Sequence, residues 1–285
     1  MKIAISAATG HFGQLAIQEL LKTVAAGDIV AVVRNREKGQ RFLPAGITVR
    51  QADYTDEIAM TTALAGIDRL LFISSVPGGP VSRQQQHANV VKAAQAAGVR
   101  YVAYTSFAKA DTAQSPLSKD HVATEALLKA SGLQVSFLRN AWYLENELSY
   151  LQAGAQGQDS VYAAGDGRIG FALEREYAEA AAKVMTTPVP KSVYEFAGTP
   201  VTYAELAATL QTVTGQAVTF KAVSDDTYRQ AMREAGVAPE LVEVLLSMQI
   251  MMRAEELDVT SSDLADVLGR PVTPLATAIR EIIAR

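Results

Sequence analysis

Residues 1–13 read MKIAISAATGHFG, and this stretch decides the fold. Residues 3–5 are an apolar run typical of a short buried strand, and the chain then enters a turn that contains Gly10 and Gly13. Residues 14–24 follow with leucine, isoleucine and valine at helical spacing. A strand, a glycine turn and an amphipathic helix in this order predict the start of a β-α-β unit.

The same alternation of apolar runs and helical patterns continues through the first half of the chain. Further strands are predicted at 29–33, 48–51, 69–73, 101–105 and 135–139. Helices are predicted between them at 36–43, 56–65, 83–97 and 119–130. Parallel strands joined by helices require right-handed crossovers, which put helices on both faces of the sheet. The sequence therefore predicts an α/β fold with a Rossmann-type, doubly wound parallel sheet.

The pattern changes after residue 145, where glycines divide the chain into short pieces. Helices are predicted there at 174–186, 202–214 and 239–256, with a strand at 193–196. We expect a Rossmann domain over residues 1–150 and a smaller C-terminal lobe over residues 151–285. The two are expected to be partly interleaved, because a segment at about 174–200 returns to the Rossmann layer.

The composition is that of an ordinary globular protein, with 285 residues, 49% hydrophobic and 20% charged. A formal net charge of −4 argues against a nucleic-acid partner. No apolar run approaches the ~20 residues that span a bilayer, and cysteine is absent, so we expect a cytoplasmic protein without a membrane partner. His11, His87 and His121 lack the spacing of metal ligands, and no metal site is predicted.

Gly10 and Gly13 fit the second and third glycines of a dinucleotide-binding fingerprint, with Ala7 at the position of the first. In such a turn the backbone approaches a pyrophosphate closely, and its N–H groups face the anion. The same glycines would also serve a simple tight turn. The strand before them and the helix after them favour a dinucleotide site.

The end of the second strand indicates which dinucleotide is bound. NAD-specific folds carry an acidic residue there, whereas this chain has Arg34 with Arg36 and Lys38 close behind. A guanidinium group matches the 2′-phosphate of NADP, and a solvated basic loop is the alternative. Asp53, after the third strand, suits either an adenine contact or the capping of a turn.

Hydroxyl residues end two later strands, as Ser74 and Ser75 and as Thr105 and Ser106. In an open parallel sheet, ligands lie outside the carboxyl ends of the strands. These hydroxyls are therefore expected to face the cofactor, although serine and threonine are equally typical turn formers.

The Tyr-x-x-x-Lys pair, which transfers a proton in many dehydrogenases, does not occur in residues 107–130. His121 and Glu125 stand there instead, four residues apart on one helical face. His121 is a candidate proton donor or pocket residue, and a structural His–Glu pair is the alternative.

Asn146 directly precedes Glu147, where a helix is predicted to start, and asparagine is among the preferred helix-cap residues. Trp142, Tyr143 and the methionine-rich stretch 248–252 offer apolar walls for a planar substrate. That stretch also suits a helix in the core or at a dimer interface.

Several segments carry a family signature, namely Ala8-Thr9-Gly10-x-x-Gly13, Val33-Arg34-Asn35, Gln51-Ala52-Asp53-Tyr54, Gln86-His87-Ala88-Asn89, Thr124-Glu125 and Leu138-Arg139-Asn140-x-Trp142-Tyr143-x-Glu145-Asn146. Together they resemble the NmrA-like atypical short-chain dehydrogenases, and the resemblance runs over nearly the whole chain. Within that family the chain is most similar to quinone reductases and triphenylmethane dye reductases.

The resemblance implies a Rossmann domain that binds NADP and direct hydride transfer from NADPH without a flavin. It places Asn146 at the nicotinamide and implicates it in quinone reduction, in which its neutral carboxamide can donate a hydrogen bond to a developing anionic oxygen. It also implies cofactor contacts from Thr9, Gly10, His11, Phe12, Arg34, Ser74, Ser75 and residues 140–145, which include Asn140, Trp142 and Tyr143. The chain departs from the family at Ala7, where relatives carry glycine, and in the Pro77–Pro80 loop.

The sequence therefore favours an NADPH-dependent oxidoreductase that transfers hydride to quinones or similar planar, electron-poor acceptors, without flavin or metal. The chain is also a candidate for homodimer formation. Two alternatives stay open, namely an NAD(P)-sensing regulatory protein without turnover, and a triphenylmethane or azo dye reductase that differs only in its acceptor.

Overall fold

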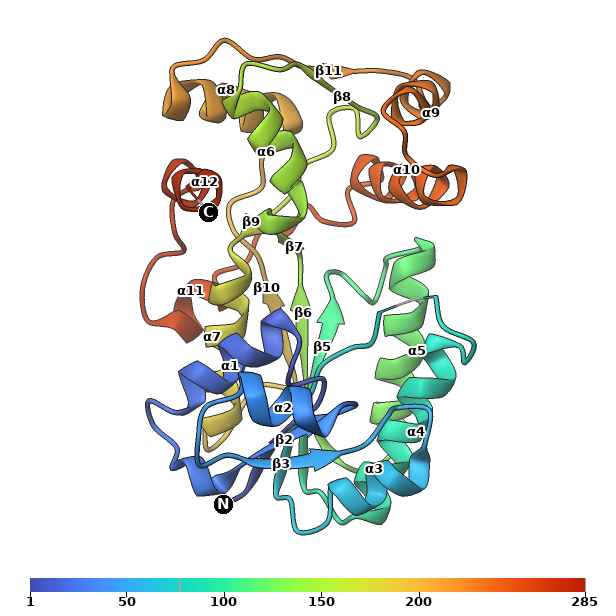
Figure 1. The fold of residues 1–285 in the computed structure, drawn as a ribbon, viewed down its shortest axis with the longest axis vertical. Coiled ribbons are helices and arrows are strands. Elements are labelled where there is room, and N and C mark those ends of the chain that lie inside the picture. The colour runs from blue at the N-terminus through green and yellow to red at the C-terminus, as the bar shows by residue number, and fades with distance from the viewer. Residues whose placement is uncertain (77, 285) are drawn as a thin grey trace. The chain divides into compact units, whose positions relative to one another are not determined.

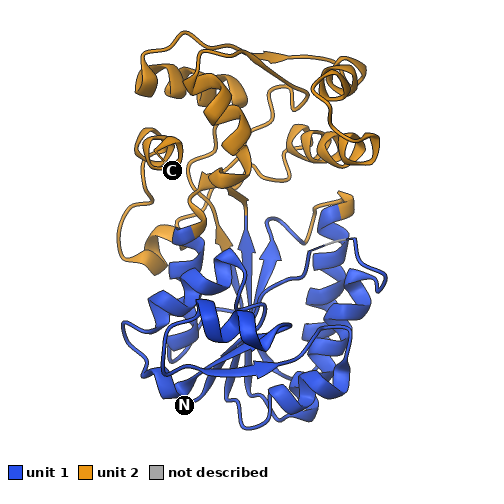
Figure 2. Cartoon of the chain, viewed as in Figure 1, with its two compact units in different colours: residues 1–110, 117–140, 175–194 blue, residues 111–116, 141–174, 195–285 orange. Residues whose placement is uncertain are grey.

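The structure is a computed structural model that describes residues 1–76 and 78–284. The chain divides into two compact units, each built from separated stretches of sequence (Figure 2). Unit 1 comprises residues 1–110, 117–140 and 175–194, and unit 2 comprises residues 111–116, 141–174 and 195–285. Pro77, the first residue of the loop in which the sequence departs from the family it resembles, lies outside the described residues.

Within the described residues, unit 1 is built around a seven-stranded sheet of order β10-β6-β5-β4-β1-β2-β3. The strands are β1 (Ile3–Ile5), β2 (Ile29–Val33), β3 (Thr48–Gln51), β4 (Arg69–Phe72), β5 (Tyr101–Phe107), β6 (Gln134–Asn140) and β10 (Val193–Phe196). From β3 to β6 every pairing is parallel. This order is that of a dinucleotide-binding sheet, so the predicted fold class is confirmed.

Helices cover both faces of this sheet (Figure 1). They are α1 (His11–Leu20), α2 (Arg36–Phe42), α3 (Glu57–Ala63), α4 (Arg83–Ala96), α5 (Pro116–Ala130) and α7 (Glu174–Thr186), with a 3-10 turn η1 (Ala26–Asp28). One hydrophobic core joins α3, α4 and α5 to the sheet through residues such as Met60, Val90, Leu128, Phe72 and Tyr104. The predicted helices and strands of this half differ from the observed ones only at their ends.

Unit 2 consists mainly of helices. They are α6 (Leu148–Ala155), α8 (Tyr203–Thr214), α9 (Asp225–Glu234), α10 (Pro239–Arg253), α11 (Asp263–Leu268) and α12 (Leu275–Ile283). Two short parallel pairs accompany them, β7 (Trp142–Tyr143) with β9 (Phe171–Ala172), and β8 (Ser160–Tyr162) with β11 (Phe220–Ala222). Sequence reasoning missed α9, because Tyr228 is its only fully buried residue and the helix is otherwise polar.

No helix in residues 1–76 and 78–284 has both the length and the apolar character needed to cross a membrane.

The backbone of the turn between β1 and α1 is closely packed. A Cβ atom at Gly13 would lie 2.8 Å from the Ala7 carbonyl oxygen and 2.8 Å from the Ala8 Cα atom. Ala7 itself has a φ of +49°, in the left-handed region that favours glycine. The turn therefore keeps its left-handed shape with alanine, at a conformational cost that a glycine would avoid.

We predict that Gly13→Ala lowers the free energy of unfolding by about 1–3 kcal/mol, because the new methyl group would overlap backbone atoms that cannot move independently of β1. Urea unfolding followed by circular dichroism measures this change. Gly27→Ala is the control, since nothing lies within 4 Å of a Cβ atom there. Equal stability of the two variants would contradict the close approach of α1 to the turn.

Candidate active site

Four strand ends of unit 1 meet along one edge of the sheet. Ala7, Arg34, Asp53 and Ser74 follow the carboxyl ends of β1, β2, β3 and β4 respectively. The strand ends are level, because Ile5 is paired with both Ala31 and Leu71 in the parallel register. The strand order reverses direction at β1 and β4, which is where open α/β sheets bind ligands.

A buried hydroxyl cluster fastens this edge. The Tyr54 hydroxyl donates to the Ile73 carbonyl oxygen at 2.7 Å and also contacts the Ser6 hydroxyl. The Ile73 N–H donates to the Ser6 hydroxyl oxygen at 3.0 Å. Burial raises the pKa of Tyr54, so the phenol stays neutral and keeps its hydrogen. The ends of β1 and β4 and the loop after β3 are therefore held together.

The glycine turn leads directly into helix α1. Gly10 is the N-cap residue and provides no side-chain cap, so the helix N-terminus presents backbone N–H groups and the positive end of its dipole. Thr9 and His11 flank Gly10, and Phe12 is buried beneath the first turn. Because Gly10 and Gly13 leave no Cβ atoms over the turn, its residues suit a pyrophosphate.

Arg34 lies at the end of β2 with an exposed side chain. Among the described residues, its guanidinium group makes no hydrogen bond or ion pair, and only its carbonyl oxygen is engaged, by Gln51. Lys38 is also exposed, in the first turn of α2, where the Asn35 side chain accepts from its N–H. Two exposed cations beside the strand end suit a ribose 2′-phosphate.

Asp53 makes a local turn. Its carboxylate accepts from the backbone N–H and the hydroxyl of Thr55, both at 2.8 Å. One of the two interpretations of Asp53, the capping of a turn, is therefore observed, and an adenine contact stays a prediction.

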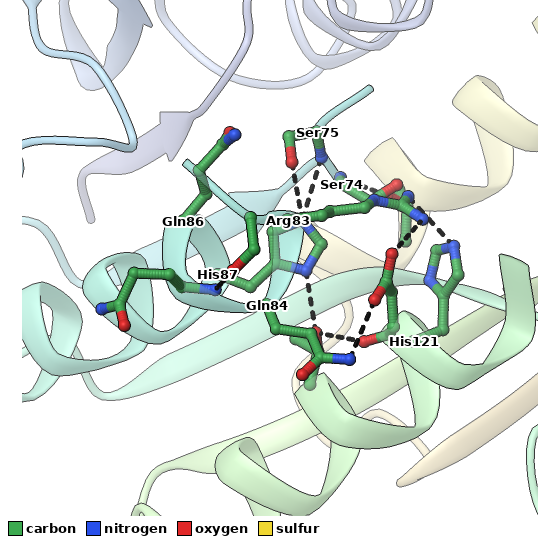
Figure 3. Close-up of polar contacts among 12 residues, drawn as sticks. Ser74, Ser75, Arg83, Gln84, Gln86, His87 and His121 are labelled. Atoms are coloured by element: carbon green, nitrogen blue, oxygen red, sulfur yellow. Dashed lines mark hydrogen bonds and ion pairs between the residues drawn. The ribbon is translucent and has the colours of Figure 1, made fainter. Parts of the chain in front are cut away.

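Ser74 and Ser75 are held by side chains from other elements. The Ser74 N–H donates to the Thr105 hydroxyl at 2.8 Å. The Ser75 N–H donates to His87 Nε2 at 3.0 Å, and the Ser75 hydroxyl lies 3.1 Å from the same nitrogen (Figure 3). On the other side of the ring, His87 Nδ1 lies 2.8 Å from the Thr124 hydroxyl. Since Nε2 accepts, the neutral His87 ring carries its hydrogen on Nδ1 and donates to Thr124.

His121 belongs to the same buried network (Figure 3). Arg83 Nη2 donates to its Nε2 at 3.1 Å, and its Nδ1 lies 2.9 Å from the Tyr104 hydroxyl. His121 is only 5% exposed, and burial together with the nearby Arg83 charge lowers its pKa well below the usual value. His121 is therefore a neutral, fixed ring.

The His121–Glu125 pair considered from the sequence is wrong, because Glu125 binds other groups. Its carboxylate accepts from Arg139 Nε at 2.9 Å and from Arg139 Nη2 at 2.7 Å, in a pair whose side chains are both 3% exposed. The Ser106 hydroxyl donates to the same carboxylate at 2.7 Å. Ser106 is thereby directed into a buried ion pair, and its expected orientation toward a cofactor is wrong.

Unit 2 contains a cavity of about 710 Å³. Its apolar walls come from aromatic and methionine side chains, which include Trp142, Tyr150, Tyr203, Met232, Met248 and Met252. Trp142 and the methionine-rich stretch therefore do line a pocket, as one interpretation predicted. Tyr143 lies beside Trp142 in β7, and Asn140 is the buried last residue of β6.

Asn146 also lines this cavity and is exposed. It lies within the 3-10 turn η2 (Leu144–Glu147), and Glu147 is the N-cap residue of α6. The helix-cap interpretation of Asn146 is therefore wrong. The carboxamide makes no hydrogen bond to another residue in the described part of the chain, so it is available to a ligand.

Comparison with known proteins agrees with this geometry. A family model described as NAD(P)H-binding matches residues 7–165, and the chain belongs to this family. An NmrA-like family domain-containing oxidoreductase of Aspergillus flavus is 28% identical over 295 residues, covering 99% of this chain and 95% of the relative. The predicted membership of the NAD(P)H-binding, NmrA-like proteins is confirmed.

Two relatives are similar over their whole length. Quinone oxidoreductase 2 of Escherichia coli is 41% identical over 282 residues, covering 98% of each chain. A solved structure of the NADPH-dependent quinone oxidoreductase from Escherichia coli, complexed with NADPH, matches with a TM-score of 0.93 over 98% of this chain and 99% of the other. Citrobacter triphenylmethane reductase matches with a TM-score of 0.94 at 35% identity over 100% of both chains.

Sequence reasoning missed the groups that only the fold brings together. The sequence gives no signal for Arg83 and Tyr104, because a lone arginine at a helix start and a tyrosine in an apolar strand belong to no motif. Glu147, Tyr203 and Gln249 come from three different elements of unit 2, and their only sequence signal is the adjacency of Glu147 to Asn146.

The two buried histidines predict how stability depends on pH. Burial and the Arg83 charge lower the pKa of His87 to about 3, and that of His121 also falls. Both rings are neutral in the folded protein but bind a proton below pH ~6.5 once unfolded. The stability that depends on these two neutral rings is therefore fully present above pH ~6.5. It decreases as the pH falls from there toward 3, because protons then bind to the unfolded chain in preference to the folded one.

At pH 5 we expect His87 alone to account for about 2 kcal/mol of lost stability relative to pH 8. Urea unfolding at several pH values measures this. His87→Gln, which keeps an acceptor for the Ser75 N–H, should show a smaller loss between pH 8 and pH 5. Identical pH dependence in the variant and the wild type would contradict the neutral, buried state of His87.

Proposed function

We propose that this protein is an NADPH-dependent oxidoreductase that transfers hydride to quinones and similar planar, electron-poor acceptors. The observation that carries the proposal is the aromatic and methionine-lined cavity of unit 2, in which the exposed Asn146 amide is available to a ligand. Similarity to the quinone oxidoreductase of Escherichia coli supports the same acceptor class.

Unit 1 supplies the cofactor site in this proposal. The α1 N-terminus and the turn at Gly10 bind the pyrophosphate, while Arg34 and Lys38 bind the 2′-phosphate. Ser74 and Ser75, held by Thr105 and His87, complete the edge of the sheet. Bound NADPH supplies the hydride. The protein contributes orientation and an environment that excludes water.

Unit 2 supplies the acceptor site. Stacking and van der Waals contact with Trp142, Tyr203 and the methionines suit a flat aromatic molecule. Asn146 is neutral at every pH and donates a hydrogen bond to the acceptor oxygen as negative charge develops on it. A quinone accepts hydride readily, so the missing Tyr-x-x-x-Lys pair is no obstacle.

Dye reduction is a second candidate activity. A cavity of about 710 Å³ has room for acceptors of several rings, and the chain is 35% identical to Citrobacter triphenylmethane reductase. The two activities share the hydride donor and differ only in the acceptor.

Steady-state NADPH oxidation with a panel of quinones tests the proposal. We expect quinone-dependent loss of NADPH absorbance well above the uncatalysed rate. Cofactor binding without turnover of any acceptor, together with a co-purifying protein, would instead identify a dinucleotide-sensing regulator.

The cytoplasm is the proposed location, since a chain without cysteine suits a reducing compartment. Homodimerisation stays a prediction.

Arg34→Ala should weaken NADPH binding by about 10- to 150-fold, because a hydrogen bond to a charged group contributes roughly 1.5–3 kcal/mol. NADH binding, which involves no 2′-phosphate, should change far less. Fluorescence titration of both cofactors measures the difference, with Arg41→Ala, in the last turn of α2, as the control. Equal losses for both cofactors would make Arg34 a structural residue.

Asn146→Asp should leave the melting temperature and NADPH binding near the wild-type values while quinone turnover falls strongly. The introduced carboxylate repels the negative charge that develops on the acceptor oxygen. Asn146→Ala, which removes the donor without adding charge, should cost at most about 2.7 kcal/mol, or roughly 100-fold in kcat. Wild-type turnover in both variants would exclude Asn146 from the reaction.

A further inference from the structure

Glu147 is a buried carboxyl group in the wall of the unit 2 cavity. It is 3% exposed and follows Asn146 directly in the chain. Trp142 Nε1 donates to its Oε1 at 2.9 Å, and the Tyr203 hydroxyl donates to its Oε2 at 2.9 Å. Side chains from β7 and α8 therefore fix both carboxyl oxygens.

The hydrogen-bond directions around Tyr203 follow from its two other partners. Gln249 Nε2 donates to the Tyr203 hydroxyl oxygen at 3.1 Å, and the Met252 sulfur, a weak acceptor, lies 3.5 Å from that oxygen. The phenolic hydrogen therefore points at Glu147, the stronger and nearer acceptor. Glu147 thus receives donors at both oxygens. When the carboxyl group is protonated, these described contacts offer no acceptor for its own hydrogen. That hydrogen therefore points into the cavity, which Glu147 lines.

The surroundings favour the neutral carboxyl group. Burial raises the pKa of Glu147, against the opposing effect of the Trp142 and Tyr203 hydrogen bonds. The titratable groups that face it are the phenols of Tyr203 on α8, Tyr150 on α6 and Tyr228 on α9, whose pKa values burial also raises. Asp159 adds a carboxylate to the cavity wall, and the described lining includes no lysine or arginine.

We propose that Glu147 is the proton donor of the reaction and transfers its carboxyl hydrogen to the oxygen of the reduced acceptor. This step rests on the proposed quinone reductase function. Hydride brings two electrons and one hydrogen nucleus to the quinone, leaving a quinolate anion. The Glu147 O–H bond then breaks as a new O–H bond forms on the quinolate, which gives the quinol. The carboxylate, held by Trp142 and Tyr203, takes its next proton from solvent.

Two hydride acceptors separate this role from a structural one. 1,4-Benzoquinone needs a proton after hydride transfer, whereas a cationic triarylmethane dye becomes neutral on accepting hydride and needs none. Glu147→Gln should lower kcat for benzoquinone by about 100-fold, which is the lower end of the range of rate enhancements that a general acid typically contributes. Its kcat for the dye and its NADPH binding should stay within twofold of wild type.

Glu256→Gln is the matched control. Glu256 is a carboxyl group of unit 2 that is 8% exposed and accepts from the Gln114 and Ser115 N–H groups, outside the cavity. Its replacement should lower stability and leave the ratio of the two turnover rates unchanged. Equal losses on both acceptors in folded Glu147→Gln would overturn the proposal.

The wild-type enzyme gives a second test that does not depend on a variant folding or on the dye being a substrate. Its kcat for benzoquinone should fall as pH rises through the pKa of Glu147, and it should show a solvent isotope effect in D2O. Absence of both, or the same alkaline decline in Glu147→Gln, would overturn the proposal. A wild type that oxidises no NADPH with any acceptor would instead refute the quinone reductase function itself.

Discussion

The pairing of β1 with β2 on one side and β4 on the other is the constraint on which unit 1 depends. Three fully buried residues, Ile3, Ala4 and Ile5, make both pairings, so any slip of this strand would displace both halves of the sheet. Its register levels the carboxyl ends of four strands and brings the glycine turn, Arg34 and Ser74 to one edge. The close approach of Gly13 to the turn then fixes the helix whose N-terminus suits a pyrophosphate.

Helix α5 carries the buried polar side chains of His121 and Glu125 and no Tyr-x-x-x-Lys pair. His121 is locked between Arg83 and Tyr104, and Glu125 forms a two-point ion pair with Arg139. Loss of one partner from a buried pair of this kind costs about 3–5 kcal/mol, which is a structural contribution. Because His121 and Glu125 are held in these buried contacts, the proposed chemistry depends on the cofactor and on the polar groups of the unit 2 cavity.

That cavity combines an apolar wall with a few polar groups, which is the usual composition of a small-molecule site. Asn146 is exposed and neutral, whereas the adjacent Glu147 is buried and fixed by two donors. Neighbouring residues therefore experience opposite environments, because the 3-10 turn η2 directs consecutive side chains to different sides. In the proposed reaction this difference separates stabilisation of the developing charge from delivery of the proton.

The sequence by itself determined the parallel α/β fold, the glycine turn and the basic end of β2, because hydrophobic periodicity and turn chemistry are local properties. The family resemblance added Asn146 and the acceptor class. Only the tertiary structure decided that Glu125 binds Arg139 rather than His121, that Asn146 does not cap α6, and that Glu147, Tyr203 and Gln249 meet. These contacts join residues distant in the sequence, and their energies depend on burial, which no local pattern specifies.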